Sequence, residues 1–582
     1  MKRIIFPIAS ALIVSTIFVQ AQNLLNNNWQ FKTGDSLEWK NTAYNASNWK
    51  SISPGAIWEN QGYQGYDGIA WYRQTLTIPS NLRKEIEKEG GITIHLGTID
   101  DADQTFFNGT LIGETGKFTP HFQSAYDIER RYFIPLKAIR WDQPNVLAIR
   151  VYDDAGGGGL TSMNVSGVIG DLGSAIKMEA TFPTVNRIFT DNKKMWVKVN
   201  VRNHSTIALN GKFDFVLTNA FYDTLKTESV KMSVAAQKDG LVTYSLPALK
   251  PGFYSLIVRI NSKRFMQADK FNFGVEPDKI EVHTDRAPDF DAFWARAKRE
   301  LAAVDPQFKL TLQDSLSNDK RSVYLVEMRS LDNVLIRGWY IRPKAEGKYP
   351  AILHVQGYSS VAVPVRKYLG DDMAALILNI RGHGNSRDEI NPGFPGFLMY
   401  NLKDRERYIY RGAYMDCIRA VDFLCSRAEV DSRYIVVEGG SQGGALSIAT
   451  AALDNKRICL CMPSVPFLSD FRDYFRVANW PANEFVDFVK KNPAFGWEKL
   501  YENLSYFDMK NLAPWIECPV FMAVGLKDVV CPPYINFAAY NQIHTAKTYI
   551  AFPEAGHSLP IECMTQKFEW MKKQLSILQK GN

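Results

Sequence analysis

The hydrophobic pattern of the chain changes near residue 280. Before that point, short runs of alternating apolar and polar residues are separated by turn signals, and after it apolar runs alternate with helical stretches. Period-two alternation is typical of half-buried antiparallel strands, whereas strands that alternate with helices are typical of a mostly parallel sheet. A helix is expected at 289–304, where Phe290 and Phe293 share one face. We predict a multidomain fold class, with two N-terminal all-β sandwich domains followed by an α/β domain at 280–582.

The all-β part divides into two segments. Residues 23–175 carry β-rich runs separated by turn signals at 108–109 and 156–159, which predicts a sandwich or jelly roll. Residues 177–275 contain four runs that alternate with period two and predict an immunoglobulin-like sandwich. We interpret this second sandwich as a spacer, because no chemically distinctive motif stands out in it.

The sharpest local signal is a strand, a glycine-rich turn and an alanine-rich helix in direct succession. Residues 434–438 read as a buried strand, and residues 439–443 spell Gly-Gly-Ser-Gln-Gly. A G-x-S-x-G motif in this setting is typical of a nucleophile elbow, which holds its serine in a strained turn with the hydroxyl exposed. The motif therefore predicts an α/β-hydrolase domain with Ser441 as its nucleophile.

An acid and a histidine must follow the serine in this fold. Asp528 follows a predicted buried strand, and His557 lies on the loop after the next strand. The rival His544 lies in a run that we expect to be helical. We predict the catalytic triad Ser441, Asp528 and His557, in which His557 takes and returns the proton and Asp528 orients the imidazole. A cysteine nucleophile is not expected.

Two backbone amides are expected to bind the oxyanion that forms during acyl transfer. Gln442 follows the nucleophile at the N-terminus of a helix, where negative charge is favoured. Tyr358 follows the predicted strand 351–355 and supplies the second amide. His383 lies in a nearby loop, where it either stabilises the loop or takes part in catalysis.

Composition bears on where the protein acts. Of 582 residues, 46% are hydrophobic and 22% charged, and the formal charge of +7 includes no dense basic run, so no nucleic acid partner is expected. Residues 1–21 read as a cleavable secretory leader, with an uncleaved anchor helix as the alternative. We expect a periplasmic or secreted protein with no integral membrane span after leader removal. The seven cysteines, all at or beyond Cys417, are interpreted as small buried side chains.

Two features of the first β segment leave alternatives open. Trp29 and Trp58 either stack on sugar rings at the surface or belong to the core. Asp100, Asp101 and Asp103 either bind calcium or form a solvated loop. Both questions depend on whether these side chains are exposed, and the pattern of residues alone does not show this.

Residues 280–582 resemble the acetyl xylan esterase and cephalosporin-C deacetylase family, known as carbohydrate esterase family seven. The matching pieces occur in the right order: DFDAFW, QGY, RGHG, YIYRGAYMDCIRAVDFL, GGSQGG, VPFLSDFRD, NLAPWIECPVFMAVGLKDVVCPP with FAAYNQI, and GHS. The resemblance implies the same triad, with the amides of Tyr358 and Gln442 as the oxyanion hole. It also implies a small acyl pocket, and the chemistry requires no cofactor and no metal.

The chain departs from that family in several places. Members usually carry Gln at the position of His383, Glu at Ser558 and His at Gln356, and they usually lack the two β domains and form hexameric rings. The additional domains therefore leave open whether this chain forms a homo-oligomer. Residues 23–175 resemble the galactose-binding-like jelly roll of glycoside hydrolase family two and sialate O-acetylesterases, through Trp71-Tyr72-Arg73, DDADQTFFNG and Ile134-Pro135.

We therefore expect an exported serine carbohydrate esterase that removes O-acetyl groups from a plant-type polysaccharide or oligosaccharide through an acyl-enzyme intermediate. The chemistry is expected to need nothing upstream of residue 280. One alternative is a peptidase of the prolyl-oligopeptidase type, although the chain shows no regular propeller-blade repeat. Another is a carbohydrate-binding protein with an inactive hydrolase domain, although the predicted triad is complete.

Overall fold

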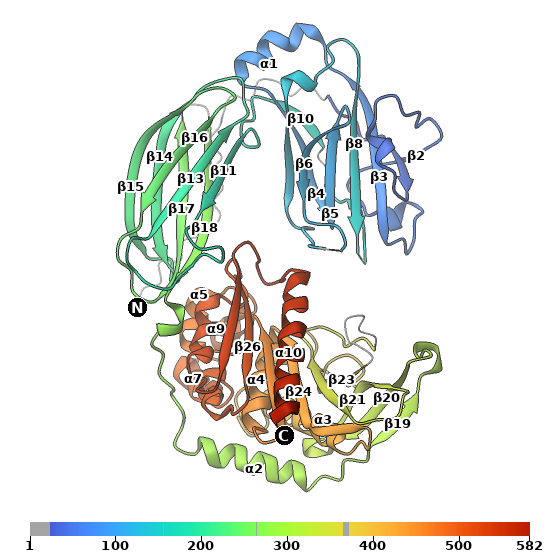
Figure 1. Cartoon of the computed structure of the whole chain (residues 1–582), viewed down its shortest axis with the longest axis vertical. Helices are drawn as coiled ribbons and strands as arrows, with labels where there is room; N and C mark the ends of the chain where they lie inside the picture. Colours follow the sequence, from blue (N-terminus) through green and yellow to red (C-terminus); the bar gives the residue numbers. More distant parts are fainter. Residues whose placement is uncertain are drawn as a thin grey trace.

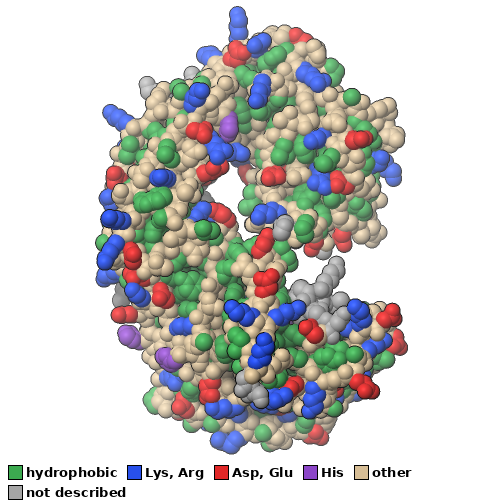
Figure 2. Space-filling view, viewed as in Figure 1, with side chains coloured by type: hydrophobic (Ala, Val, Ile, Leu, Met, Phe, Trp, Pro, Cys, Tyr) green, Lys and Arg blue, Asp and Glu red, His purple; other side chains and the backbone are tan. Residues whose placement is uncertain are grey.

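The computed structural model describes residues 24–120, 122–154, 156–163, 165–262, 265–364 and 372–581. The predicted leader lies outside these residues. Figure 1 shows three units: two made of strands, and one that combines a large sheet with helices. The second β unit bridges the first β unit and the α/β unit along one side of the molecule, and Figure 2 shows the same outline with its side chains.

The first β unit contains two sheets. One has the order β2 (Lys50–Ile52), β1 (Trp29–Thr33), β3 (Gly68–Thr77), β8 (Pro144–Asp153), β5 (Ala102–Phe107) and β6 (Thr110–Thr115). The other joins β10 (Ser166–Ile169), β4 (Ile92–Asp100) and β7 (Glu129–Ile134), with β9 (Gly159–Leu160) also on β4; helix α1 (Arg83–Glu89) precedes β4. Side chains of both sheets, such as Tyr72 and Ile94, share one buried cluster.

The second β unit is built in the same way from two sheets. One has three strands, β11 (Ile176–Thr181), β13 (Trp196–Asn203) and β16 (Asp239–Ser245). The other has the order β12 (Ile188–Phe189), β18 (Met266–Val275), β17 (Gly252–Ser262), β14 (Leu209–Asn219) and β15 (Thr224–Val234). Alternating positions of β13, such as Val197 and Val199, meet Phe213 and Leu256 of the larger sheet in one core, as period-two patterning requires.

The α/β unit is organised around one nine-stranded sheet. Its strand order is β19 (Lys309–Leu312), β20 (Arg321–Arg329), β21 (Leu335–Pro343), β23 (Ala374–Asn379), β22 (Tyr349–Val355), β24 (Val430–Gly440), β25 (Ile458–Ser464), β26 (Val520–Gly525) and β27 (Lys547–Phe552). In this spatial order, the strands from β23 through β22 to β27 are parallel to one another. The strands β19, β20 and β21 pair antiparallel, and β21 joins them to β23.

Helices cover both faces of this sheet. They are α2 (Phe290–Ala302), α3 (Ile409–Cys425), α4 (Gln442–Leu453), α5 (Phe471–Val477), α6 (Ala482–Lys491), α7 (Gly496–Ser505), α8 (Met509–Leu512), α9 (Pro533–Tyr540) and α10 (Ile561–Gly581). Val436 and Val437, neighbours on β24, belong to separate cores, because successive side chains of a strand point to opposite faces. The predicted helix at 289–304 is confirmed as α2, with Phe290 and Phe293 buried.

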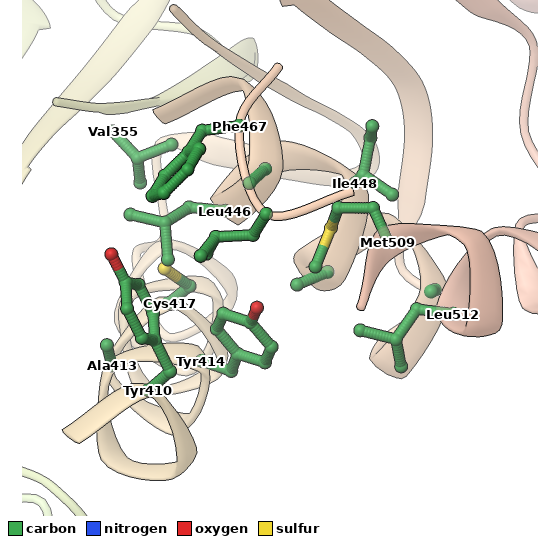
Figure 3. Packing of buried hydrophobic residues seen from close by; sticks show 14 of the residues in the cluster. Val355, Tyr410, Ala413, Tyr414, Cys417, Leu446, Ile448, Phe467, Met509 and Leu512 are labelled. Carbon is green, nitrogen blue, oxygen red and sulfur yellow. The ribbon is translucent and has the colours of Figure 1, made fainter. Parts of the chain in front are cut away.

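Helix α4, which follows the nucleophile motif, is enclosed on every side. All twelve of its residues are buried. Figure 3 shows Leu446 and Ile448 of α4 close to Tyr414 of α3 and Met509 of α8. A helix that is buried on every side belongs to a core, and this one provides a rigid support behind the turn that carries Ser441.

Candidate active site

The predicted site residues lie at the carboxyl edge of the parallel strands. Tyr358 follows β22, Ser441 follows β24, Asp528 follows β26 and His557 follows β27. Because the carboxyl ends of parallel strands meet at one edge of a sheet, four positions far apart in sequence come together there. Ligands of open α/β sheets bind at this edge.

The turn at Ser441 has the strained geometry that the motif predicts. The backbone of Ser441 has φ 59° and ψ −122°, a conformation that residues with a side chain rarely adopt. The neighbouring glycines are required by close approach: a Cβ at Gly439 would lie 2.5 Å from the main-chain oxygen of Val355, and one at Gly443 only 2.1 Å from it. The strand, the turn and the helix therefore pack too closely for any larger residue at these two positions.

Ser441, His557 and Asp528 form one hydrogen-bonded chain. His557 Nε2 lies 2.9 Å from Ser441 Oγ, and His557 Nδ1 lies 2.9 Å from Asp528 Oδ2. The Asp528 side chain is fully buried, and the amides of Val530 and Cys531 each donate to its Oδ1 at 2.8 Å. One carboxylate oxygen is thus held by the backbone, and the other is left to orient the imidazole of His557. The His557 side chain is 28% exposed.

Tyr358 and Gln442, the predicted oxyanion residues, both lie beside Ser441. Gln442 follows it directly, and a Cβ at Gly357 would lie 3.9 Å from the Cβ of Ser441, so the loop that carries Tyr358 is adjacent. The hydroxyl of Tyr358 donates to Glu484 at 3.0 Å, which fixes the position of the Tyr358 side chain. The loop that carries Tyr358 therefore lies next to the nucleophile.

The side chain of Gln442 is held by two partners that the sequence analysis did not connect to it. The Tyr410 hydroxyl donates to Gln442 Oε1 at 2.7 Å, and Gln442 Nε2 lies 3.2 Å from His383 Nε2. Since an amide nitrogen can only donate, His383 Nε2 is the acceptor and the imidazole is neutral. Burial lowers the pKa of His383 to about 4, in agreement with that state.

His383 is therefore not part of the Ser441 chain. Its ring packs edge-on against Phe394 and Phe397, with centroid separations of 4.9 and 4.5 Å. Of the two readings that the sequence left open, the loop-stabilising one agrees with this position. His544 also lies outside the hydrogen-bonded chain. The expectation of a helix at His544 is wrong, because α9 ends at Tyr540 and His544 is exposed beyond it.

Cys531 is a neighbour of Ser441 that the sequence analysis did not single out. Burial raises the pKa of its thiol well above the usual value, the Asp528 carboxylate adds to that effect, and contact with Ser441 opposes it. Cys531 therefore places a neutral thiol in contact with the nucleophile. Within the described residues all seven cysteines are unpaired, and five of them are buried.

A cavity of about 540 Å³ opens beside Tyr358. Its wall includes Phe394, Trp480 and Glu484, and Trp480 is 47% exposed. The ring of Trp480 lies 5.9 Å from that of Tyr358. The cavity thus combines flat apolar surfaces with a carboxylate, next to the loop that carries Tyr358.

The open questions in the first β unit are settled for its tryptophans. Trp29 and Trp58 are fully buried, so neither is available to stack on a sugar. Asp103 is also buried and pairs with Arg130 at 2.9 Å. Among the residues that the structure describes, no group of three or more His, Cys, Asp or Glu side chains could hold a metal ion.

None of the helices in the described ranges is long and apolar enough to cross a membrane.

Comparison with known proteins places the α/β unit in a family. A family model described as acetyl xylan esterase (AXE1) matches residues 279–574. Acetyl esterase Axe7A of Xylanibacter ruminicola is 30% identical over 340 residues, which is 56% of this chain and 75% of that protein. Among solved structures, the acetyl xylan esterase from Paenibacillus sp. R4 is 32% identical, with a TM-score of 0.48, covering 51% of this chain and 98% of that one.

A second solved structure is similar to the same part of the chain. Acetyl xylan esterase 1 from Thermoanaerobacterium sp. JW/SL YS485 is 29% identical, with a TM-score of 0.49, covering 51% of this chain and 97% of that one. The family model extends across half of the sequence and contains Tyr358, Ser441, Asp528 and His557. This chain therefore belongs to the acetyl xylan esterase family and is a carboxylic ester hydrolase.

Proposed function

We propose that this protein is an exported serine carbohydrate esterase that removes O-acetyl groups from plant-type polysaccharides or oligosaccharides, with acetylated xylan as the first candidate substrate. The observation that carries the proposal is the hydrogen-bonded chain from Ser441 through His557 to Asp528, at 2.9 Å for each bond, within the region that matches the family. This geometry supports acyl transfer by a serine nucleophile.

In the proposed reaction, Ser441 Oγ attacks the acetyl carbonyl while His557 Nε2 takes the hydroxyl proton. The carbonyl oxygen becomes an oxyanion, which the amides of Tyr358 and Gln442 stabilise. As the tetrahedral intermediate collapses, the bond to the sugar oxygen breaks and His557 returns the proton to that oxygen. Water then attacks the acetyl-enzyme while His557 takes its proton. The bond to Ser441 Oγ breaks, His557 returns the proton to that oxygen, and acetate is released.

Each supporting residue has one task in this scheme. Asp528 keeps the proton of neutral His557 on Nδ1, so that Nε2 can accept, and it stabilises the charged imidazolium that follows. Tyr410 and His383 hold the side chain of Gln442 from two sides. Gln442 is thereby fixed at both its backbone and its side chain, which keeps its amide directed at the developing charge.

The remaining parts of the proposal rest on sequence. Export rests on the leader-like pattern of residues 1–21. We propose that 23–175, 177–275 and 280–582 are three domains, and that the first is a jelly roll. The two-sheet cores of the first two ranges support this division. A preference for acetyl groups is supported by the resemblance to esterases with a small acyl pocket.

The experiment that tests the proposal is a measurement of acetate release from a panel of acetylated glycans: xylan, xylo-oligosaccharides and pectin. Butyryl and octanoyl esters of one aryl alcohol are compared with the acetyl ester in parallel. We expect acetate release from acetylated xylan, together with a rate that falls steeply with acyl length. Activity on aryl esters but on none of the glycans would refute the carbohydrate assignment, and rates that rise with acyl length would indicate a lipase-like enzyme.

A further inference from the structure

The second β unit packs directly on the loops that carry Asp528 and His557. Asn272 Nδ2 donates to the main-chain oxygen of Leu526 at 2.6 Å. Arg187 pairs with Glu554, which lies three residues before His557, and Lys527 pairs with the same carboxylate at 2.5 Å. The β unit is therefore joined to both loops, and a spacer role does not account for these contacts.

A cavity of about 690 Å³ lies between these two parts of the molecule. The second β unit forms one wall, mainly through β11, β17, β18 and the end of β14, and the α/β unit forms the other, mainly through residues 526–529 and 532–534. Pockets that bind small ligands typically measure about 300–1,000 Å³. Neither unit encloses this space alone, so the cavity exists only where the two units meet.

The charges around the cavity nearly balance. Three acidic and three basic side chains line it in addition to Asp528: Glu179, Asp269, Glu554, Arg187, Lys270 and Lys527. Asp528 is a fourth acidic residue of the lining, and its carboxylate is fully buried and faces His557 and two backbone amides. A lining whose acidic and basic residues differ by only one attracts anions and cations weakly. It suits an uncharged ligand that offers many hydrogen-bonding groups.

Several polar groups of the wall have hydrogen-bonding capacity to spare. Half-buried Asp269 accepts one side-chain bond, from Gln267 at 3.0 Å, and forms no salt bridge with any residue in the described ranges. Burial raises the pKa of the Asp269 carboxyl group above its ordinary value. Arg187 Nη1 is buried with no hydrogen-bond partner among the described residues. Buried polar groups without partners are costly, and ligand hydroxyls would satisfy them.

The cavity also has aromatic surfaces. Tyr222, which is 46% exposed, and Tyr534 both line it. The ammonium group of Lys270, which is exposed, lies 5.6 Å from the centre of the Tyr222 ring. Flat rings beside hydrogen-bonding groups match the two kinds of surface that a sugar presents, namely its C–H faces and its hydroxyl edge.

We propose that this cavity is a binding subsite for a neutral saccharide, formed jointly by the second β unit and the loops that carry Asp528 and His557. The choice of ligand rests on the proposed function, since sugar units of an acetylated polymer are the neutral polyols that this enzyme would meet. Sugar units held there raise the local concentration of a long substrate near Ser441, which a small ester does not gain.

The test measures binding without catalysis. In the full chain carrying Ser441→Ala, calorimetry follows the binding of deacetylated xylohexaose. Asp269→Ala and Lys270→Ala are then added together, and we expect the affinity to fall about tenfold or more. The matched control is Lys226→Ala with Glu228→Ala, an exposed ion pair on β15, three strands from β18, which should leave the affinity unchanged.

Two results would overturn the inference: an unchanged affinity in the Asp269/Lys270 variant, or no binding of xylohexaose to the Ser441→Ala parent. The proposed function fails by a different result, namely no acetate release by the wild-type protein from any acetylated glycan. Thermal melting of each variant identifies a loss of fold, and a second variant, Lys270→Met, keeps the shape of the wall and removes one of its polar groups. It should also bind xylohexaose less tightly.

Discussion

Asn272 of the second β unit donates a hydrogen bond of 2.6 Å to the main-chain oxygen of Leu526, two residues before Asp528. The two residues are separated by more than 250 positions, and the bond connects the second β unit to the loop that carries the acid of the candidate triad. Ser255 Oγ donates in turn to Asn272 Oδ1 at 2.8 Å, so the amide is held on both sides. The expectation that the chemistry needs nothing upstream of residue 280 overlooked this contact.

The first prediction concerns that bond. Asn272→Leu removes the donor beneath the Asp528 loop, and a neutral hydrogen bond contributes about 1 kcal/mol. We expect kcat on an aryl acetate to fall about fivefold with little change in KM, because the substrate does not contact Asn272. The control is Asn210→Ala, an exposed position of the same sheet. Equal kcat values for the two variants would mean that the β unit does not influence the triad.

The second prediction concerns Asp528. In Asp528→Asn, the amide oxygen accepts the two backbone bonds that now fix the carboxylate, which turns the NH₂ group towards His557 Nδ1. The imidazole proton then moves to Nε2, which can no longer accept the proton of Ser441. We expect kcat to fall by about 10⁴. Steady-state rates on an aryl acetate measure this, and a loss below about tenfold would refute the role of Asp528.

The third prediction separates two contributions of His383, namely its hydrogen bond to Gln442 and the packing of its ring. In His383→Gln, the side-chain oxygen can still accept from Gln442 Nε2, whereas His383→Leu leaves that buried donor unsatisfied at a cost of about 1–3 kcal/mol. We expect near-normal kcat for the first variant and a loss of about tenfold for the second. If both variants lose equally, the ring of His383 contributes through packing alone and not through the hydrogen bond.

The fourth prediction concerns pH. Burial lowers the pKa of His383 from 6.5 to about 4, so the unfolded chain binds a proton that the folded chain refuses between these values. The stability that this residue contributes is therefore complete above pH 6.5 and is lost as the pH falls towards 4. Denaturant unfolding at pH 7 and pH 5 should show a smaller loss of stability in His383→Gln than in wild type. An equal loss would place the proton uptake elsewhere.

The sequence was most informative where local geometry demands particular residues. Gly439 and Gly443 are required by close backbone approach, and Asp528 and His557 come after strands whose ends meet at one edge. Exposure was not predictable in the same way: Trp29 and Trp58 are buried, although a surface tryptophan would occupy the same kind of position in the pattern. Whether such a tryptophan is buried depends on the second sheet that packs against its strand, and no local pattern shows this.

Contacts across long sequence separations were also missed. Tyr410 and His383 meet at Gln442, and Cys531 lies beside Ser441, because helix α3 and the loops after two strands converge at the elbow. Each of these residues is ordinary in its own segment, so no motif distinguishes it. The relationship becomes visible only when the fold places the segments together.

The most direct test of the central claim is acetate release from acetylated xylan by the wild-type protein and by Ser441→Ala, purified side by side. Ser447→Ala is the matched control, since it removes a buried hydroxyl from the same helix outside the site. We predict release by the wild-type and control proteins, and a rate on the order of 10⁶ lower for Ser441→Ala, which retains its fold. A Ser441→Ala protein that keeps more than about one hundredth of the wild-type rate would contradict the assignment of Ser441 as the nucleophile.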